Sequence, residues 1–246
     1  MKIGILTCGY VDPPLSDGYG QYADMIERSM SVVNQSLSFE NYDAIKGDLP
    51  SLDDCDGFIL TGSVHNAYDD DPWIVDLAEW IRRCETRRKP LVGICFGHQL
   101  IARALGGKVV KSEKGWGLGS YAVNVIEQKR WMKLAIDSVR LLVSHQDQVV
   151  ILPSGMRVIA HNEFCPNFML AKDNHIFTVQ GHPEFSVDFT ARLVEKRKSI
   201  ISDSHYRSAY EELDKTQDSA LICHWIDEFF VYNQQHQDEN RYSQVG

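Results

Sequence analysis

Short apolar runs alternate along the first hundred residues with segments in which apolar residues recur at helical spacing. The runs 2–6, Gly57–Leu60 and Leu91–Ile94 have the length and apolar content of buried strands. Segments 19–33 and 72–88 place apolar residues three and four positions apart, as amphipathic helices do. This alternation predicts an α/β fold with a mostly parallel central sheet and helices on both faces.

The rest of the chain extends this pattern without a linker. Residues 108–172 are richer in strand-like runs, and two helical patterns close the chain. The further expected strands are 37–42, 121–126, 139–143, 157–161, 168–172 and 176–180, and the closing helices are 187–201 and 220–232. With no internal repeat or low-complexity segment, we expect one domain over residues 1–232 and a polar, flexible tail over 233–246.

Composition and charge narrow the classes of function. The 246 residues carry a formal net charge of −9, which argues against a nucleic-acid partner because phosphate contacts need a basic face. No apolar run approaches the about 18 residues of a membrane span, and the N-terminus lacks the apolar core of a signal peptide. The six cysteines form no C-x-x-C pair, and no Cys/His cluster has metal-ligand spacing. We therefore expect a cytoplasmic protein with reduced thiols, no metal, no cofactor and no membrane partner.

A candidate nucleophile lies at the end of the run Leu91–Ile94. Cys95 follows this run directly and a helical pattern starts at Phe96, so Cys95 lies on a strand-to-helix turn. Gly93 and Gly97 flank it, which gives the G-x-nucleophile-x-G elbow with cysteine in place of serine. The N-terminus of the helix supplies partial positive charge and free N–H groups, which favour a thiolate and an oxyanion. A buried, inert cysteine is the alternative, and the flanking glycines argue against it.

A candidate base follows the expected strand 176–180. His182 precedes Pro183, which favours an extended backbone, and in an extended segment residues two apart project to the same side. Glu184 can then orient the His182 ring and stabilise its charged form. Such pairs are common on protein surfaces, but an elbow and a His-Pro-Glu motif in this order, each after a strand, predict catalytic roles for Cys95, His182 and Glu184.

These motifs resemble those of a known family. The segments Gly-Ile-Cys-Phe-Gly-His-Gln at 93–99 and Gly-His-Pro-Glu at 181–184 are similar to class I (triad) glutamine amidotransferases, most closely to the glutaminase domain of GMP synthases and its free-standing relatives. The resemblance covers about residues 1–230 and implies a flavodoxin-like three-layer sandwich. It implies that Cys95 attacks the side-chain amide of glutamine or another γ-glutamyl bond, that His182 protonates the leaving amine and that Glu184 orients His182. Water then hydrolyses the γ-glutamyl thioester.

An acyl-transfer site also needs N–H donors for the oxyanion. We expect Phe96, next after the nucleophile, to supply one, and Gly62, in the loop after Gly57–Leu60, to supply the second. The resemblance places a glycine-rich oxyanion loop here, commonly Gly-Gly-Pro, whereas this chain has Leu-Thr-Gly-Ser at 60–63. An ordinary turn after a buried strand is the alternative.

The resemblance assigns substrate contacts to three polar residues. Gln99 lies on the first turn of the elbow helix, and segment 144–149 is similar to the Ser-His-x-Asp-x-Val segment beside the glutamine pocket of GMP synthases. Ser144 and His145 are the expected contacts there, and a polar turn between two strands is the alternative. For His98, also on the elbow helix, we expect a structural role.

Two further segments have two interpretations each. Asp71 is an N-cap candidate before a proline, and the other carboxylates of the acidic run 69–71 face either a substrate ammonium group or solvent. The loop 115–119 either lines the pocket with Trp116 or covers the core.

Three functions are compatible with these residues. No ATP-pyrophosphatase domain follows the glutaminase-like region, which favours a free-standing enzyme that acts on glutamine or γ-glutamyl compounds. The second is a glutaminase subunit that delivers ammonia to a separate synthase. The third is a catalytically silent binding module, against which the intact Cys95, His182 and Glu184 argue. The expected partner is a small-molecule substrate, and the alternative partner is a synthase subunit.

Overall fold

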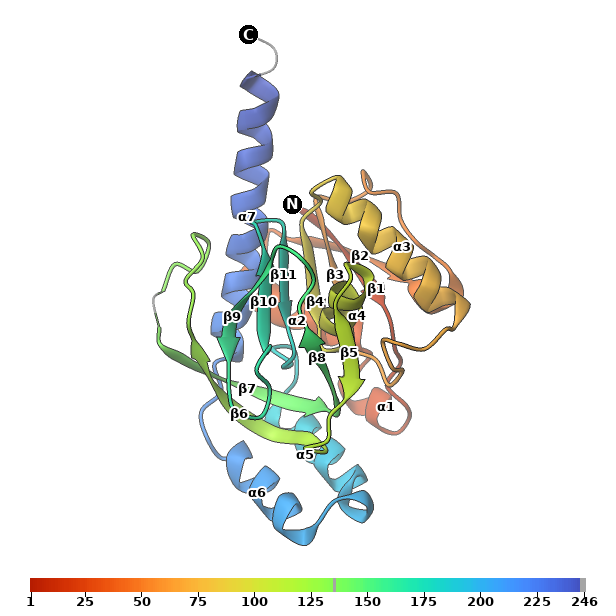
Figure 1. The fold of residues 1–246 in the computed structure, drawn as a ribbon, viewed down its shortest axis with the longest axis vertical. Helices are drawn as coiled ribbons and strands as arrows, with labels where there is room; N and C mark the ends of the chain where they lie inside the picture. Colours follow the sequence, from red (N-terminus) through yellow and green to blue (C-terminus); the bar gives the residue numbers. More distant parts are fainter. Residues whose placement is uncertain (135, 244–246) are drawn as a thin grey trace.

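A computed structural model describes the backbone of residues 1–134 and 136–243, and the side chains of those residues up to His236. Figure 1 shows the fold. The strands are β1 Lys2–Thr7, β2 Ser38–Asp43, β3 Gly57–Leu60, β4 Leu91–Ile94, β5 Lys108–Lys111, β6 Gly117–Val125, β7 Ser138–His145, β8 Asp147–Ile151, β9 Met156–His161, β10 Met169–Lys172 and β11 Ile176–Val179. The helices are α1 Leu15–Tyr19, α2 Tyr22–Val33, α3 Pro72–Thr86, α4 Phe96–Ala104, α5 Val187–Lys196, α6 Asp203–Leu213 and α7 Ser219–Ser243, with 3-10 turns at Ala44–Lys46 and Lys198–Ile200.

The main sheet has nine strands in the order β2-β1-β3-β4-β11-β10-β9-β6-β7. β2, β1, β3, β4 and β11 pair in parallel, and antiparallel pairs join β10, β9, β6 and β7 to β11. The expected parallel sheet is therefore confirmed over its first five strands. The middle of the chain, where strands follow one another without helices, supplies the antiparallel side and the separate β5–β8 pair.

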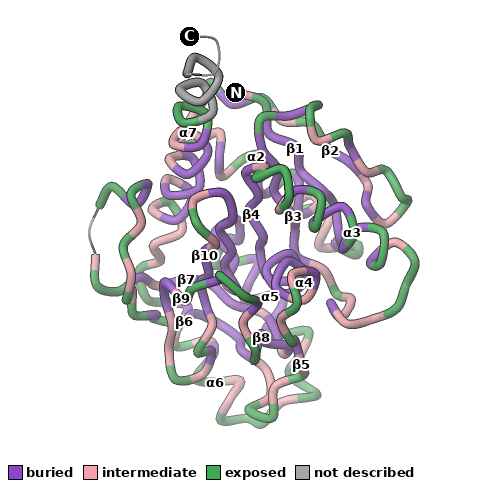
Figure 2. Tube along the Cα trace, turned by 45° about the horizontal axis from the view of Figure 1, so that its top comes forward, coloured by how far each residue is buried: buried purple, intermediate pink, exposed green. Residues whose placement is uncertain are grey.

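Helices cover both faces of the sheet, which confirms the expected three layers. α2 and α7 pack on one face, α3 and α4 on the other, and α5 and α6 cover β6 and β7 (Figure 1). Residues within one strand alternate between the faces: Ile59 joins the core under α2 and α7, whereas Phe58 and Leu60 join the core under α3 and α4. The central strands β3 and β4 are accordingly buried along their length (Figure 2), because a parallel sheet covered on both sides has no solvated face.

The C-terminal helix is longer than the sequence pattern predicts. α7 continues through residues 233–243, which we expected to be a flexible tail, and residues 244–246 lie outside the described part. Asn233 is buried and donates hydrogen bonds to the carbonyl oxygens of Asn174 (2.7 Å) and Phe229 (2.8 Å). The sequence predicts a helix that ends at residue 232 because the apolar residues at helical spacing end there. The polar residues that follow continue the helix without such a pattern.

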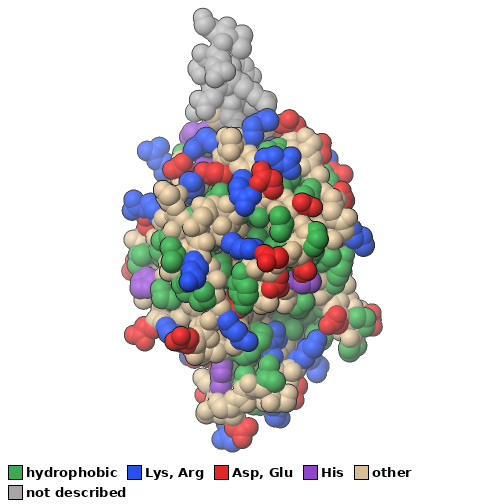
Figure 3. Space-filling model, turned by 45° about the vertical axis from the view of Figure 1, so that its right-hand side comes forward, with side chains coloured by type: hydrophobic (Ala, Val, Ile, Leu, Met, Phe, Trp, Pro, Cys, Tyr) green, Lys and Arg blue, Asp and Glu red, His purple; other side chains and the backbone are tan. Residues whose placement is uncertain are grey.

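Other differences concern short or polar elements. The helix expected over 19–33 is divided into α1 and α2 at Gly20, and α6 was not expected because few of its residues are buried. The described helices include none that is long and apolar enough to cross a membrane. On the face drawn in Figure 3, acidic and basic side chains lie side by side and neither forms an extended patch.

The parallel strands bring distant segments to one edge of the sheet. In the parallel register Leu60 lies opposite Gly93, and Ile94 lies opposite Val179. The residues that follow these strands, Thr61, Cys95 and Gln180, therefore emerge next to one another. The loops at the carboxyl ends of parallel strands are where α/β folds place their binding sites.

Candidate active site

Cys95 lies on a strained turn between β4 and α4. Its backbone has φ of +51° and ψ of −98°, a combination that costs a non-glycine residue about 1–3 kcal/mol. Two hydrogen bonds hold the turn: the Cys95 N–H donates to the Val179 carbonyl (2.9 Å) and the Gly97 N–H donates to the Thr61 carbonyl (3.2 Å). The side chain is buried but lines a pocket, so the strain presents the sulfur to that pocket.

The two elbow glycines are required by close packing. A Cβ atom on Gly93 would lie 2.6 Å from the carbonyl carbon of Gly97, and a Cβ atom on Gly97 would lie 2.6 Å from the carbonyl oxygen of Leu60. Real Cβ contacts are not this short, so any larger residue would move the helix relative to the strands. The glycines thus let α4 approach β3 and β4 closely enough to hold Cys95 at the edge.

His182 and Glu184 form a buried pair beside Cys95. The Nδ1 atom of His182 lies 2.7 Å from Oε1 of Glu184, and both side chains are almost completely buried. The extended backbone expected here is wrong: Pro183 and Glu184 form a turn, which the Phe185 N–H closes onto the His182 carbonyl at 3.5 Å. Proline favours the second position of such turns, so the side chains meet across a turn instead.

Packing and charge both act on the His182 ring. The ring stacks on Phe185 with centroids 3.8 Å apart and planes 6° apart, and the His182 N–H donates to the Leu142 carbonyl (2.9 Å). Burial alone would lower the pKa of His182, but the negative charges of Glu184 and Cys95 outweigh it and raise the pKa well above its usual value. The arrangement therefore favours the charged form of the His182 imidazole.

Gln180 is a neighbour of the sulfur that no sequence pattern singled out. Its Nε2 atom lies 3.6 Å from the sulfur of Cys95 and its Oε1 atom accepts from Nε2 of Gln99 (3.1 Å). Gln180 is completely buried. The signal that could have found it is the parallel register of β4 and β11, because Gln180 follows β11 as Cys95 follows β4.

The two expected oxyanion donors belong to peptides next to Cys95: Phe96 follows it directly in the chain, and the peptide at Gly62 borders its side chain. A Cβ atom on Gly62 would lie 3.8 Å from Cβ of Cys95 and 3.1 Å from Cε1 of His182, so the peptide at Gly62 borders both side chains. The N–H groups of Gly62 and Phe96 have no acceptor within the described residues. Both groups are therefore free to donate to a ligand.

His98 points away from the sulfur, as expected for a structural residue. Its Nδ1 atom bonds the hydroxyl of Thr178 on β11 (2.8 Å), and the ring is completely buried. Burial lowers the pKa of His98 to about 3, with a smaller contribution from His145. A neutral ring bonded to the sheet is no candidate for the base.

Gln99, Ser144 and His145 line the same pocket as Cys95. Gln99 donates to the Asp147 carbonyl (2.9 Å), and the same carbonyl lies 3.1 Å from Nδ1 of His145. Burial lowers the pKa of His145 to about 4, so the ring is neutral and Nδ1 carries its proton. Oγ of Ser144 and Nε2 of His145 are buried and have no partner among the described residues. Unpaired buried polar atoms in a pocket wall are available to a ligand.

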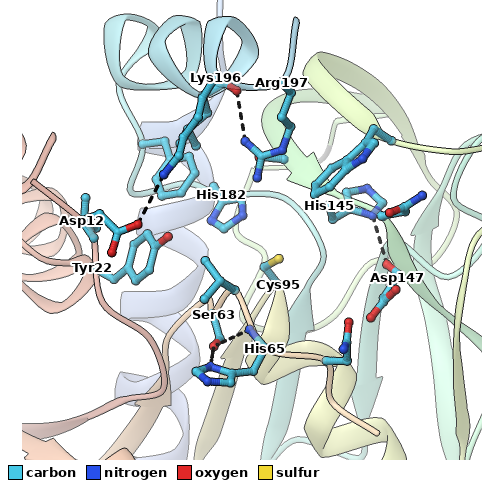
Figure 4. Close-up of a pocket in the computed structure, with 18 of the residues that line it drawn as sticks. Asp12, Tyr22, Ser63, His65, Cys95, His145, Asp147, His182, Lys196 and Arg197 are labelled. Carbon is cyan, nitrogen blue, oxygen red and sulfur yellow. Dashed lines mark hydrogen bonds and ion pairs between the residues drawn. The ribbon is translucent and has the colours of Figure 1, made fainter. Parts of the chain in front are cut away.

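The pocket has a volume of about 430 Å³ and extends well beyond the sulfur. In Figure 4 Cys95 and His182 lie at its centre, with His145 on one side and Tyr22 on the other. Trp116 lines the pocket and also packs against the core residues Leu118, Val194 and Ala209, so both interpretations of its loop apply.

The acidic run 69–71 does not line the pocket. Asp69 accepts hydrogen bonds from the backbone and side chain of Asn66, and Asp70 lies 3.5 Å from Arg103. Asp71 is at the N-cap position of α3, before Pro72, but its side chain makes no capping bond. Asp69 therefore orders the loop before α3, and for the run 69–71 a contact with a substrate ammonium group is not supported.

The chain is similar to several known proteins. The family model "Glutamine amidotransferase class-I" matches residues 15–198. Gamma-glutamyl peptidase 3 of Arabidopsis thaliana is 30% identical over 187 residues, which are 72% of this chain and 74% of the relative. A glutamine-hydrolyzing GMP synthase subunit of Sulfolobus acidocaldarius is 41% identical over 113 residues, 46% of this chain and 58% of the relative. The crystal structure of a glutamine amidotransferase from Thermotoga maritima superimposes with a TM-score of 0.74 at 19% identity, covering 94% of this chain and 98% of that one.

Proposed function

Because the chain belongs to the class I glutamine amidotransferases, we propose that it hydrolyses the γ-glutamyl amide bond of glutamine or of γ-glutamyl peptides by itself, through a thioester on Cys95. One observation carries the proposal: a cysteine on a strained elbow borders an imidazole that a buried carboxylate holds at 2.7 Å. This is the nucleophile, base and orienting acid that acyl transfer requires.

In the first half-reaction the sulfur of Cys95 attacks the carbonyl carbon of the γ-amide. The N–H groups of Phe96 and Gly62 stabilise the oxyanion that forms, because both are without an acceptor in the described part of the chain and border the sulfur. His182 gives its proton to the leaving nitrogen, the C–N bond breaks and a γ-glutamyl thioester remains. Glu184 keeps the Nδ1 proton in place, so that Nε2 is the atom that exchanges protons.

In the second half-reaction water attacks the thioester. His182, now neutral, takes a proton from the water. The second tetrahedral intermediate then collapses with the sulfur as the leaving group, and His182 is again charged, as at the start of the cycle. Glutamate and an amine are the products. The proton balance needs no metal or cofactor, and the described residues contain no cluster of three or more metal-ligating side chains.

The glutamyl part of the substrate is proposed to bind beside Ser144, His145 and Gln99. Support comes from two buried atoms, Oγ of Ser144 and Nε2 of His145, which have no hydrogen-bond partner among the described residues. The hydroxyl donates to the α-carboxylate, and the neutral imidazole accepts from the α-ammonium group. Gln99 is held by the Asp147 carbonyl and Gln180, which fixes its position in the wall.

Steady-state kinetics on the purified chain test this proposal. The substrates are glutamine and a set of γ-glutamyl peptides, with ammonia and amino-acid release measured in parallel. A glutamine-like electrophile should label Cys95 alone, because burial raises the pKa of each of the other five thiols (Cys8, Cys55, Cys84, Cys165 and Cys223). The Cys95→Ala variant is the control and should take up no label. A chain that takes up no label and turns over no substrate would be a binding module instead.

A glutaminase that serves a separate synthase is the second candidate. The similarity to a GMP synthase subunit favours it, although that match covers 46% of this chain. Negligible turnover of the isolated chain, restored by adding a synthase partner, would support this second function over the first.

A further inference from the structure

The pocket has a second compartment that glutamine does not require. When glutamine is hydrolysed the leaving group is ammonia, which needs almost no space. The pocket nevertheless continues past His182 to a wall formed by α2, α5 and the loop after β1. This wall lies on the side of Cys95 opposite to His145 and Asp147, as Figure 4 shows.

Arg197, directly after α5, brings a positive charge into this compartment. Its guanidinium points from the helix end into the space above Cys95 and His182 (Figure 4). The side chain lines the pocket, is half-buried and donates one hydrogen bond, from Nη1 to the Leu193 carbonyl (3.0 Å). Among the described residues no carboxylate lies within 4.0 Å of it.

The surroundings hold Arg197 in place without neutralising it. The guanidinium stacks on the Trp116 ring, 4.3 Å from its centroid. The hydroxyl of Tyr22 has no hydrogen-bond partner in the described part of the chain, and burial raises the pKa of Tyr22, so the phenol remains a neutral donor. The other cation on this side, Lys196, is paired with Asp12 at 3.3 Å.

From this arrangement, and on the basis of the proposed function, we infer that Arg197 binds a carboxylate in the leaving group of the substrate. A leaving group with a positively charged substituent would be repelled by Arg197, and one with a neutral substituent would leave the guanidinium without a counter-charge. A leaving amino acid with a free carboxylate supplies two oxygens in a plane, which a guanidinium binds through paired N–H donors. The preferred substrate class is therefore a γ-glutamyl peptide that ends in a free carboxylate close to the scissile bond.

Two substrates that differ only at this carboxylate test the inference. γ-Glutamyl-glycine carries the carboxylate, and γ-glutamyl-glycinamide replaces it with a neutral amide of nearly the same size. We expect kcat/KM of the wild type to be about 10- to 100-fold higher for γ-glutamyl-glycine, the range of a hydrogen bond to a charged group. Arg197→Gln should reduce this ratio to within about threefold of unity.

Two further variants separate charge from structure. Arg197→Lys keeps the charge but loses the planar fork, and we expect an intermediate ratio. Lys198→Gln, one position further, removes the same charge from an exposed side chain outside the pocket and should keep the wild-type ratio.

The outcomes distinguish this inference from the proposed function. If the wild type hydrolyses both substrates at equal rates, the carboxylate subsite is refuted and γ-glutamyl hydrolysis stands. If it hydrolyses neither, the proposed function fails, and calorimetric binding to Cys95→Ala decides the subsite. There γ-glutamyl-glycine should bind at least tenfold more tightly than γ-glutamyl-glycinamide, and adding Arg197→Gln should remove the difference. Equal dissociation constants would overturn the inference.

Discussion

Replacing Glu184 with glutamine tests the buried pair most directly. The change removes one negative charge and keeps the shape, so Nδ1 of His182 faces an amide instead of a carboxylate at 2.7 Å. The second carboxylate oxygen, Oε2, is buried without a hydrogen-bond partner among the described residues. An NH₂ group at the Oε2 position would therefore find no acceptor, so the NH₂ group of Gln is expected to face the imidazole. Nδ1 of His182 would then accept a hydrogen bond, and the ring proton would move to Nε2.

The size of the effect follows from burial. Removing one partner of a buried ion pair costs about 3–5 kcal/mol when the other charge stays. Because the imidazole can lose its proton instead of staying charged, the cost should lie at the lower end of this range. We expect the free energy of unfolding to fall by about 3 kcal/mol near pH 6. For a chain of this size that is a decrease of roughly 6–12 °C in Tm.

The loss should depend on pH in a defined direction. The pKa of His182 is raised in the folded state, so its charged form contributes stability that is fully present below the unfolded pKa of about 6.5. That contribution is lost as pH rises through the folded pKa, about 10. The Tm difference between wild type and Glu184→Gln should therefore be largest below pH 6.5 and small above pH 10.

Thermal unfolding at pH 6 and pH 10 measures this difference. Glu211→Gln is the matched control, because it removes the same charge from an exposed residue that makes no ion pair in the described part of the chain. A Glu184→Gln difference that is constant with pH, or equal to that of the control, would refute the coupling between Glu184 and His182. In kcat, the variant should retain at least about tenfold more activity than His182→Ala, since the orienting carboxylate of a triad costs less to remove than the base.

The remaining predictions concern the elbow and its neighbours. Cys95→Ser should lower the hydrolysis rate by several orders of magnitude in a chain that still folds; wild-type-like turnover in the unlabelled variant would remove Cys95 from the mechanism. His98→Ala should lower stability, because it breaks a buried hydrogen bond, yet its kcat should exceed that of His182→Ala; equal losses of kcat would point to the wrong histidine. Gly97→Ala should cost roughly 1–3 kcal/mol and lower kcat, because the new Cβ would lie 2.6 Å from a backbone oxygen of β3. Gly18→Ala, where nothing lies within 4 Å of the new Cβ, is its control in denaturant unfolding and should change little.

The parallel half of the fold could be predicted because its signals are local. Short apolar runs identified β1, β3 and β4, because these strands are buried on both faces of the sheet. Helical spacing identified α3, because one face of that helix is buried. The same holds for Cys95, because an elbow is a contiguous motif with the strand before it and the helix after it. His182 and Glu184 followed from a second contiguous motif, although the backbone between them forms a turn and is not extended.

The other wall of the pocket could not be predicted because it depends on contacts between distant segments. Gln180 becomes a neighbour of Cys95 only through the register of β4 and β11. Trp116 and Arg197 are 81 positions apart in the sequence and stack only because α5 packs over β6 and β7. The helix α6 exposes most of its residues, so apolar periodicity carries little information about it.

The position of Arg197 also constrains how substrate recognition acts on catalysis. His182 and Glu184 lie in the turn that leads into α5, and Arg197 lies at the other end of that helix. Phe185 stacks on the His182 ring, and Phe189, in the first turn of α5, packs against Phe185 with centroids 4.6 Å apart. A carboxylate bound at Arg197, as proposed above, would therefore restrain the same segment that positions the base. Such coupling would alter kcat as well as KM for γ-glutamyl-glycine. The kcat for γ-glutamyl-glycinamide, which lacks the carboxylate, would measure catalysis by His182 without this restraint. For this reason the ratio between the two substrates, measured in one variant, is more informative than the rate of either substrate compared between variants.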